Sequence, residues 1–265
     1  MTFIDMALDP FKGKVSSKQS DLVSRIESES PELQEALRMF EEDKDKSSKF
    51  GFPLEKLAIL NPNQIDLVLQ TLITSKSSDP DKHRLALVSY VNGLIQRSYD
   101  QSYNGFILST GDFNPFMALK EITGTKDRLM KIHIHGNGGD YLGDLSRYLD
   151  VTVLGNVGRD SPHRAKNSIF RIEGDSDMSM GYGTWDSKIV VQGKVGDYFA
   201  QYSQRTTFEF MNGCGFMWFQ DNKKNSDMPK DCGFIAHDAK TYSHIFATLG
   251  YKGMWKYRNK VERAR

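Results

Sequence analysis

Apolar residues recur at a fixed interval in residues 129–219, and no other part of the chain repeats in this way. In each repeat two apolar residues flank one other residue, an alternation that is typical of a β-strand with one buried face. The period of nineteen residues is too long for a heptad and too short for the common two-helix repeats. Five strands are therefore predicted, one at each of the pairs Ile132/Ile134, Val151/Val153, Phe170/Ile172, Ile189/Val191 and Phe208/Phe210.

Glycines follow each apolar pair at two fixed positions, four and seven residues after its first member. At two of these places the residue is Asn212 or Asp177, and both types also accept a left-handed backbone. We therefore interpret the glycines as repeated chain reversals that need this backbone conformation. The predicted structural glycines are Gly136, Gly139, Gly155, Gly158, Gly174, Gly193, Gly196 and Gly215.

Stacked repeats of this kind would pair each strand in parallel with its copy in the next repeat. Because parallel connections are strongly right-handed, the pattern predicts a right-handed parallel β-helix, a single-stranded solenoid of about nineteen residues per coil. A row of small residues at the same period is typical of an inward corner. The small row is Ser146, Ala165, Thr184 and Ser203, and a bulky row of Leu142, Met180, Phe199 and Trp218 is interrupted at Ser161.

The outward positions of the predicted strands mix Leu154, Val190 and Met211 with charged residues. Part of this face is therefore predicted to pack against the helical part of the chain or against another copy of it. The open edges at both ends of such a stack invite aggregation unless other segments cover them. The helices before Tyr99 and the segment after Asp221 are placed to do so.

The first part of the chain has helical rather than strand periodicity. Apolar residues three to four apart predict helices from Asp21, from Pro31 to about Phe40, over Gln64–Ile73 and over Asp81–Tyr99. We interpret the segment 103–124 as a strand followed by a short helix. The predicted fold class is α+β, with a helical N-terminal domain in residues 1–125, the β-helix in 126–238 and a helical tail in 239–265.

The charge balance limits the classes of partner. The chain has 35 basic and 34 acidic residues, so nothing in its composition requires a nucleic acid or an anionic membrane. The basic stretch 251–265 is interpreted as a surface helix. The pattern of a signal peptide and the apolar run of a membrane span are both absent from the sequence, which favours the cytoplasm. Cys214 and Cys232 are predicted to be free thiols.

The repeats at 151–160, 169–177 and 188–200, with their glycine rows and apolar alternation, resemble a known family. They are similar to the GXGXG-type β-helix at the C-terminal end of the large chain of glutamate synthase, a domain that also occurs in the formylmethanofuran dehydrogenases. The resemblance covers about residues 129–220, roughly a third of the chain. It implies a structural spacer and assembly surface without catalytic residues of its own.

Two groups of residues could bind a metal. His133 and His135 lie on the same side of a predicted strand, where two imidazoles could bind zinc or another transition metal. Packing or hydrogen bonding of these histidines is the alternative. Cys214, Cys232, His237 and Asp238 could form a zinc site, although they lack the close Cys-x-x-Cys spacing of such sites.

A glycine-rich stretch at 136–140 has the composition of a phosphate-binding loop. Such a loop should lead into a helix whose N-terminal amides bind the phosphate, whereas the same glycine spacing recurs in nearly every repeat. A repeated turn explains the stretch better. No cofactor is therefore predicted.

The predicted function is that of a non-catalytic structural or assembly protein, whose β-helix binds a protein partner or a second copy of the chain. Neither nucleic acid nor membrane is an expected partner. The alternative is a metal-dependent enzyme, a hydrolase, acting at the face that carries His133 and His135. The metal content and the oligomeric state of the purified protein would separate these two hypotheses.

Overall fold

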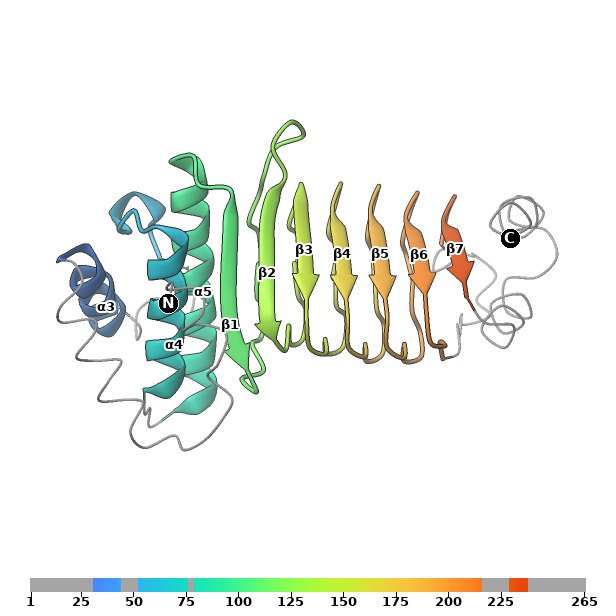
Figure 1. The fold of residues 1–265 in the computed structure, drawn as a ribbon, viewed down its shortest axis with the longest axis horizontal. Helices are drawn as coiled ribbons and strands as arrows, with labels where there is room; N and C mark the ends of the chain where they lie inside the picture. Colours follow the sequence, from blue (N-terminus) through green and yellow to red (C-terminus); the bar gives the residue numbers. More distant parts are fainter. Residues whose placement is uncertain (1–30, 44–51, 76–78, 216–228, 238–265) are drawn as a thin grey trace, which may run out of the picture.

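The structure is a computed structural model that describes residues 31–43, 52–75, 79–215 and 229–237. Figure 1 shows the chain as a row of parallel strands with helices at one end. The predicted helix from Asp21, the predicted tail helix in 239–265 and Asp238 lie outside the described residues.

Among the described residues, three α-helices precede the sheet: α3 (Pro31–Asp43), α4 (Pro62–Thr74) and α5 (Pro80–Asp100). Each begins at a proline, a residue that suits the first helical position because its missing N–H would have no partner there. Asn61 also forms a capping box with Gln64, and the Asp79 side chain accepts a hydrogen bond from the Lys82 N–H. These residues explain why the predicted and observed starts of the helices agree closely.

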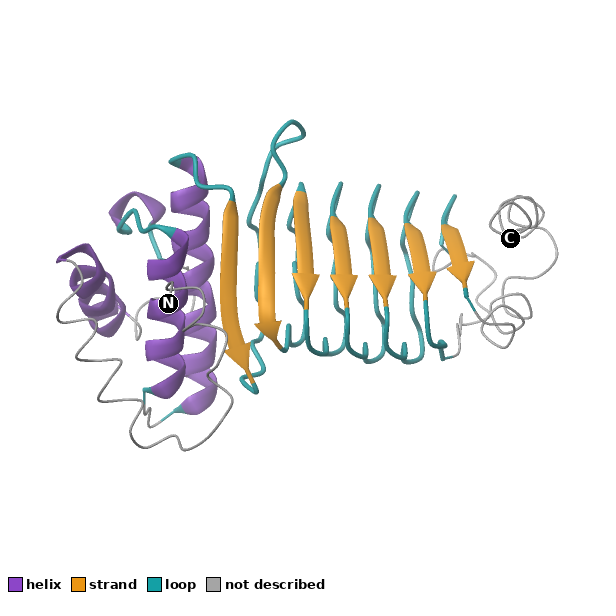
Figure 2. Ribbon diagram, in the orientation of Figure 1, coloured by secondary structure: helices purple, strands orange, loops and turns teal. Residues whose placement is uncertain are grey.

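All seven strands run parallel in one sheet, in the order in which they occur along the chain. Figure 2 shows them side by side in orange. The strands are β1 (Gly105–Gly111), β2 (Met130–Gly136), β3 (Leu149–Val153), β4 (Ile169–Ile172), β5 (Lys188–Val191), β6 (Thr207–Phe210) and β7 (Gly233–Ala236).

The sheet topology corrects the predicted fold class, a helical domain followed by a right-handed β-helix solenoid. The structure contains a single open, all-parallel, seven-stranded sheet with the three helices, which is an α/β arrangement. The difference arises at β1, which lies outside the nineteen-residue period: Phe106 lies opposite Ile132, 26 residues later. Helix α4 packs on this strand, so helices and strands share one continuous core.

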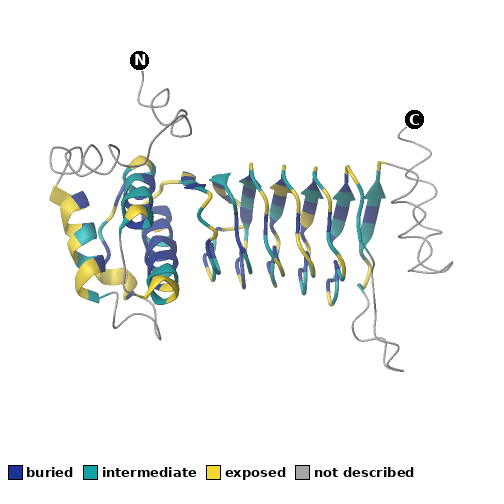
Figure 3. Cartoon of the chain, turned by 90° about the horizontal axis from the view of Figure 1, so that it is seen from below, coloured by how far each residue is buried: buried dark blue, intermediate teal, exposed yellow. Residues whose placement is uncertain are grey.

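From β2 to β6, residues nineteen positions apart face each other. Val151 lies opposite Phe170, and Phe170 lies opposite Ile189. All ten residues of the five apolar pairs are at most 1% exposed. The connections between these strands contain no helix, lie on one side of the sheet (Figure 3) and pair with one another through two rows of isolated parallel bridges. The repeat seen in the sequence is thus the register of the sheet.

The segment after β1 contains no helix, contrary to the prediction. Residues 112–121 form turns and one isolated bridge, in which Met117, Leu119 and Glu121 have positive φ. A helix would require these three residues to lie in the right-handed region instead. Their backbone groups bond to the next repeat, as when the Met117 N–H donates to the Asp140 carbonyl.

The side chains of α5 cap the backbone of the first connection. The Asn92 side chain accepts a hydrogen bond from the Leu119 N–H (2.9 Å) and donates one to the Met117 carbonyl (3.3 Å). Gln96 makes the same two contacts with the backbone of Thr123, at 2.7 and 3.3 Å. Backbone groups that would otherwise form an open edge are therefore satisfied by a helix.

Helix α4 caps the neighbouring edge of β1. The carboxylate of Asp66 accepts hydrogen bonds from the backbone N–H and the hydroxyl of Ser109, and Gln70 donates a third. Burial raises the pKa of Asp66, and these hydrogen bonds oppose that effect. The prediction that the helices before Tyr99 cover the first edge is confirmed.

The predicted left-handed backbone occurs at Gly136 (φ 127°) and Gly139 (φ 71°). At Gly155, Gly174 and Gly193 the reason for glycine is different, because a Cβ there would lie 2.4–2.5 Å from the carbonyl oxygen of the corresponding glycine one repeat earlier. These residues are needed because successive repeats approach closely. A Cβ at the remaining predicted positions, Gly158, Gly196 and Gly215, would likewise lie 1.8–2.8 Å from an atom of the preceding repeat.

Candidate functional site

His133 and His135 lie on β2 and point to the outward side of the sheet. His133 is exposed and is flanked on the adjacent strands by Ile107 and Thr152, whereas His135 is half-buried and lies near the Asp66 carboxylate. Within the described residues, no group of three or more His, Cys, Asp or Glu side chains could hold a metal ion. Binding of a metal by this pair stays a prediction.

Cys214 and Cys232 are free thiols in the structure, and both are half-buried. Burial raises the pKa of the Cys232 thiol, whose sulfur lies 3.4 Å from the Ser203 hydroxyl. His237 contacts a different residue: its Nε2 lies 3.0 Å from a carboxylate oxygen of Glu209. Binding of zinc by these three residues stays a prediction, and its fourth candidate ligand lies outside the described residues.

The outward face of the sheet carries exposed apolar side chains between paired charges. Ile107, Leu154 and Met211 are 42%, 42% and 37% exposed. Four charged residues of this face pair across adjacent strands: Arg171 with Asp150, and Lys188 with Glu209 at 3.0 Å. Partial burial raises the pKa of Glu209, but hydrogen bonds from Lys188 and His237 lower it by more.

A ladder of rings runs along the connections. We use the name tyrosine ladder for Tyr141, His163, Tyr182 and Tyr202, which come from successive repeats. The centroids of neighbouring rings lie 5.2, 5.3 and 5.0 Å apart. The rings of His163 and Tyr182 are stacked, and the other two pairs are edge-on or tilted. The four rings thus form a continuous row along the connections between the strands.

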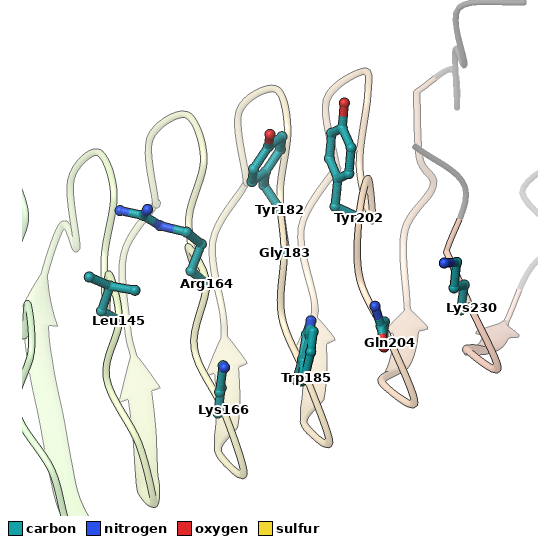
Figure 4. Close-up of a pocket in the computed structure, with 9 residues that line it drawn as sticks. All are labelled: Leu145, Arg164, Lys166, Tyr182, Gly183, Trp185, Tyr202, Gln204 and Lys230. Atoms are coloured by element: carbon teal, nitrogen blue, oxygen red, sulfur yellow. The ribbon is translucent and has the colours of Figure 1, made fainter. Parts of the chain in front are cut away.

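A groove of about 410 Å³ lies beside this ladder. Figure 4 labels its nine lining residues, and the row of Lys166, Trp185, Gln204 and Lys230 forms one of its sides. These four are consecutive partners in one row of isolated bridges, which also includes Arg147 next to Lys166. Four side chains of one bridge row and two of the tyrosine ladder, Tyr182 and Tyr202, therefore border a single groove.

A buried carboxylate contacts an arginine and a histidine at one end of the groove. Asp144 is 2% exposed and accepts two hydrogen bonds from Arg164, at 2.9 and 3.0 Å. The Nδ1 of His163 lies 2.8 Å from the same carboxylate, so this nitrogen carries the proton when the ring is neutral. Such a pair leaves Nε2 as the basic nitrogen, but the carboxylate charge is already balanced by Arg164. The arrangement fixes Arg164 and the ladder in position.

Sequence patterns alone did not predict this cluster. Two signals could have located it: the bulky row is interrupted at Ser161, and Asp144 and His163 occupy equivalent positions in adjacent repeats. In the structure Ser161 is buried, and its hydroxyl accepts a hydrogen bond from the Leu142 N–H and donates one to the Gly139 carbonyl. A polar residue in an apolar row thus marks the place where the repeat changes.

Asp160 lies in the same cluster, and we expect it to make stability depend on pH. Burial raises its pKa, against the opposing effects of His163, Arg159 and a hydrogen bond from Tyr141. The folded protein therefore holds this proton more tightly than the unfolded chain. As the pH rises past the pKa of an unfolded aspartate, about 3.9, unfolding is favoured until the folded carboxyl group has also ionised.

The free energy of unfolding of Asp160→Asn should consequently rise relative to that of the native protein as the pH increases between the unfolded and the folded pKa of Asp160. Above the folded pKa the difference between the two proteins should stay constant. Urea unfolding of both proteins between about pH 3 and about pH 7 measures the difference at each pH. A difference that does not change with pH, or that falls as the pH rises, would contradict the expectation.

None of the helices in the described part of the chain is long and apolar enough to cross a membrane. Comparisons with protein families, curated proteins and solved structures found no match for this chain. The resemblance to the glutamate synthase domain therefore stays a prediction.

Proposed function

We propose that this chain is a non-catalytic assembly protein of the cytoplasm, which binds a protein partner or a second copy through the outward face of its sheet. The observation that carries the proposal is that, among the residues the structure describes, no helix lies along the outward face of strands β3 to β7. All-parallel sheets are normally covered on both faces, whereas here the helices of the described residues lie at the β1 end (Figure 1).

The composition of the face supports burial against a protein. Exposed apolar side chains such as Leu154 contribute favourably when they leave water, at about 25 cal/mol per Å². Two pairs of charges on this face, Arg171 with Asp150 and Lys188 with Glu209, are formed within the sheet, so these residues can keep their partners when a second surface approaches. Paired charges cost less to desolvate than isolated ones.

Adding charge to the face tests the proposal. We expect the double variant Leu154→Lys, Val190→Lys to weaken assembly at least about tenfold, because it replaces two apolar side chains of the interface with cations that must lose water on binding. Both positions are solvent-accessible, so the thermal midpoint should change little. Light scattering across a concentration series measures self-association, and co-purification at a fixed stoichiometry identifies another partner.

Met178→Lys provides the matched control. Met178 is 45% exposed, like Leu154, but it lies within a connection, whereas Leu154 directly follows β3 and Val190 lies on β5. Its substitution should leave assembly unchanged. A native protein that is strictly monomeric and has no stoichiometric partner would overturn the proposal, as would equal effects of the strand and connection variants.

A further inference from the structure

The charged residues that line the groove beside the tyrosine ladder are all positive. Its nine lining residues include the cations Arg164, Lys166 and Lys230, and none of the nine is an aspartate or glutamate. Arg164 is already paired with Asp144, so Lys166 and Lys230 provide most of the positive potential. The nearby acids are Asp186, which pairs with Arg205, and Asp231, which follows Lys230 in the chain. The lining therefore favours an anionic ligand.

The two lysines stand at a defined separation. Lys166, Trp185, Gln204 and Lys230 are successive bridge partners, so three strand-to-strand steps separate the lysine backbones. At roughly 4.8 Å per step, this distance is about 14 Å. Figure 4 shows the four side chains in one line beside Tyr182 and Tyr202. The groove thus presents two positive charges with hydrogen-bonding groups between them.

The rings that border the groove pack against other groups of the protein. Tyr182 lies between His163 and Tyr202, with centroid distances of 5.3 and 5.0 Å. The Lys166 ammonium lies 4.4 Å from the centre of the Trp185 ring, and Arg205 approaches the same ring from the following repeat at 5.9 Å. Binding of single-stranded nucleic acid relies on base stacking against open ring faces. These contacts leave less ring surface for base stacking and therefore disfavour nucleic acid.

An extended peptide matches the remaining features. Its residues advance by about 3.3 Å, so two carboxylates four positions apart are separated by roughly 13 Å, close to the distance between the lysines. The peptide also offers backbone carbonyls to donors such as the Gln204 amide and the Trp185 Nε1–H. Each ammonium–carboxylate contact is a charge-assisted hydrogen bond.

We infer that this groove binds an extended acidic segment of the protein partner, with two carboxylates four residues apart at Lys166 and Lys230. The inference rests on the proposed assembly function and names the chemistry of the partner at a second surface, distinct from the outward face of the sheet. The interaction is electrostatic and should weaken as the salt concentration rises.

Fluorescence anisotropy of the full chain with labelled probes tests the inference. The first probe is a short peptide in which three neutral residues separate two glutamates, and the second has glutamines in their place. The third is a single-stranded poly(U) oligonucleotide. We expect the glutamate peptide to bind at least about tenfold more tightly than the other two probes, and its affinity to fall with added salt.

The variant Lys166→Glu, Lys230→Glu should lose at least about tenfold in affinity for the glutamate peptide, because attraction becomes repulsion. Lys194→Glu is the matched control, since this exposed lysine lies in the turn after β5, outside the groove. Circular dichroism checks that each variant is folded, and the single variant Lys230→Gln, at an exposed site, gives a second measurement with little risk to folding.

Equal binding of the glutamate and glutamine peptides would overturn the inference, and so would tighter binding of poly(U) or an unaffected double variant. If the protein still assembles through its sheet face in that case, the proposed function stands without the groove. If the peptide binds as expected but the protein neither self-associates nor co-purifies with a partner, the proposed function fails and the groove remains a peptide-binding site.

Discussion

Gly174→Ala is expected to destabilise the protein by about 3 kcal/mol or more, although it adds a single carbon atom. The new Cβ would lie 2.5 Å from the Gly155 carbonyl oxygen and 2.4 Å from the side-chain oxygen of Asn156. The first of these is a backbone atom in the adjacent repeat, so relief requires the two repeats to separate. That movement would strain the hydrogen bond from the Gly174 N–H to the Gly155 carbonyl.

Gly105→Ala is the control for this prediction. Gly105 begins β1, and no atom lies within 4 Å of the position of its added Cβ. The expected change is within about 0.5 kcal/mol. Urea unfolding of the native protein and both variants provides the free energies. Similar values for the two variants would mean that close approach of the repeats does not explain the glycines.

Asn92→Ala is expected to cost about 1–3 kcal/mol because it leaves the buried Leu119 N–H without a partner. The Asn92 side chain accepts from the Leu119 N–H and donates to the Met117 carbonyl, and Leu119 is fully buried. Water cannot replace the lost partner without opening the contact between α5 and the first connection. The variant should therefore lose protection of the Leu119 amide against hydrogen exchange, in addition to stability.

Leu85→Ala serves as the matched control on the same helix. Leu85 is 40% exposed, and alanine is at least as good a helix former, so a change within about 0.5 kcal/mol is expected. A small effect of Asn92→Ala on both unfolding and exchange at Leu119 would show that α5 does not seal this edge.

The strands of the repeat could be predicted because their apolar pairs alternate and return at a constant interval. The helix starts could be predicted for a similar local reason, since Pro31, Pro62 and Pro80 each stand at a first helical position. The role of β1 could not be predicted, because its pairing with β2 depends on an offset of 26 residues that occurs outside the period. The predicted fold class was wrong for this reason.

The candidate sites illustrate the same limit. His133 and His135 form a candidate pair because they are close in sequence, yet their neighbours in the sheet are set by pairing with Ile107 and Thr152. The groove residues are nineteen or more positions apart, so their proximity depends on the register of the whole stack. Local motifs do not contain that information. Two signals in the sequence indicated that this part of the repeat differs: the interruption of the apolar row at Ser161 and the equivalent positions of Asp144 and His163.

The pairing of every strand from β2 to β6 with residues nineteen positions away also restricts how the length of this chain can change. Loss or gain of nineteen residues removes or adds one whole unit, and the units on either side meet in the same register. A change of one residue inside a strand would turn its buried side chains outward. Duplication can therefore lengthen the molecule only by whole units of nineteen residues. Each added unit extends the sheet and the groove by one strand spacing.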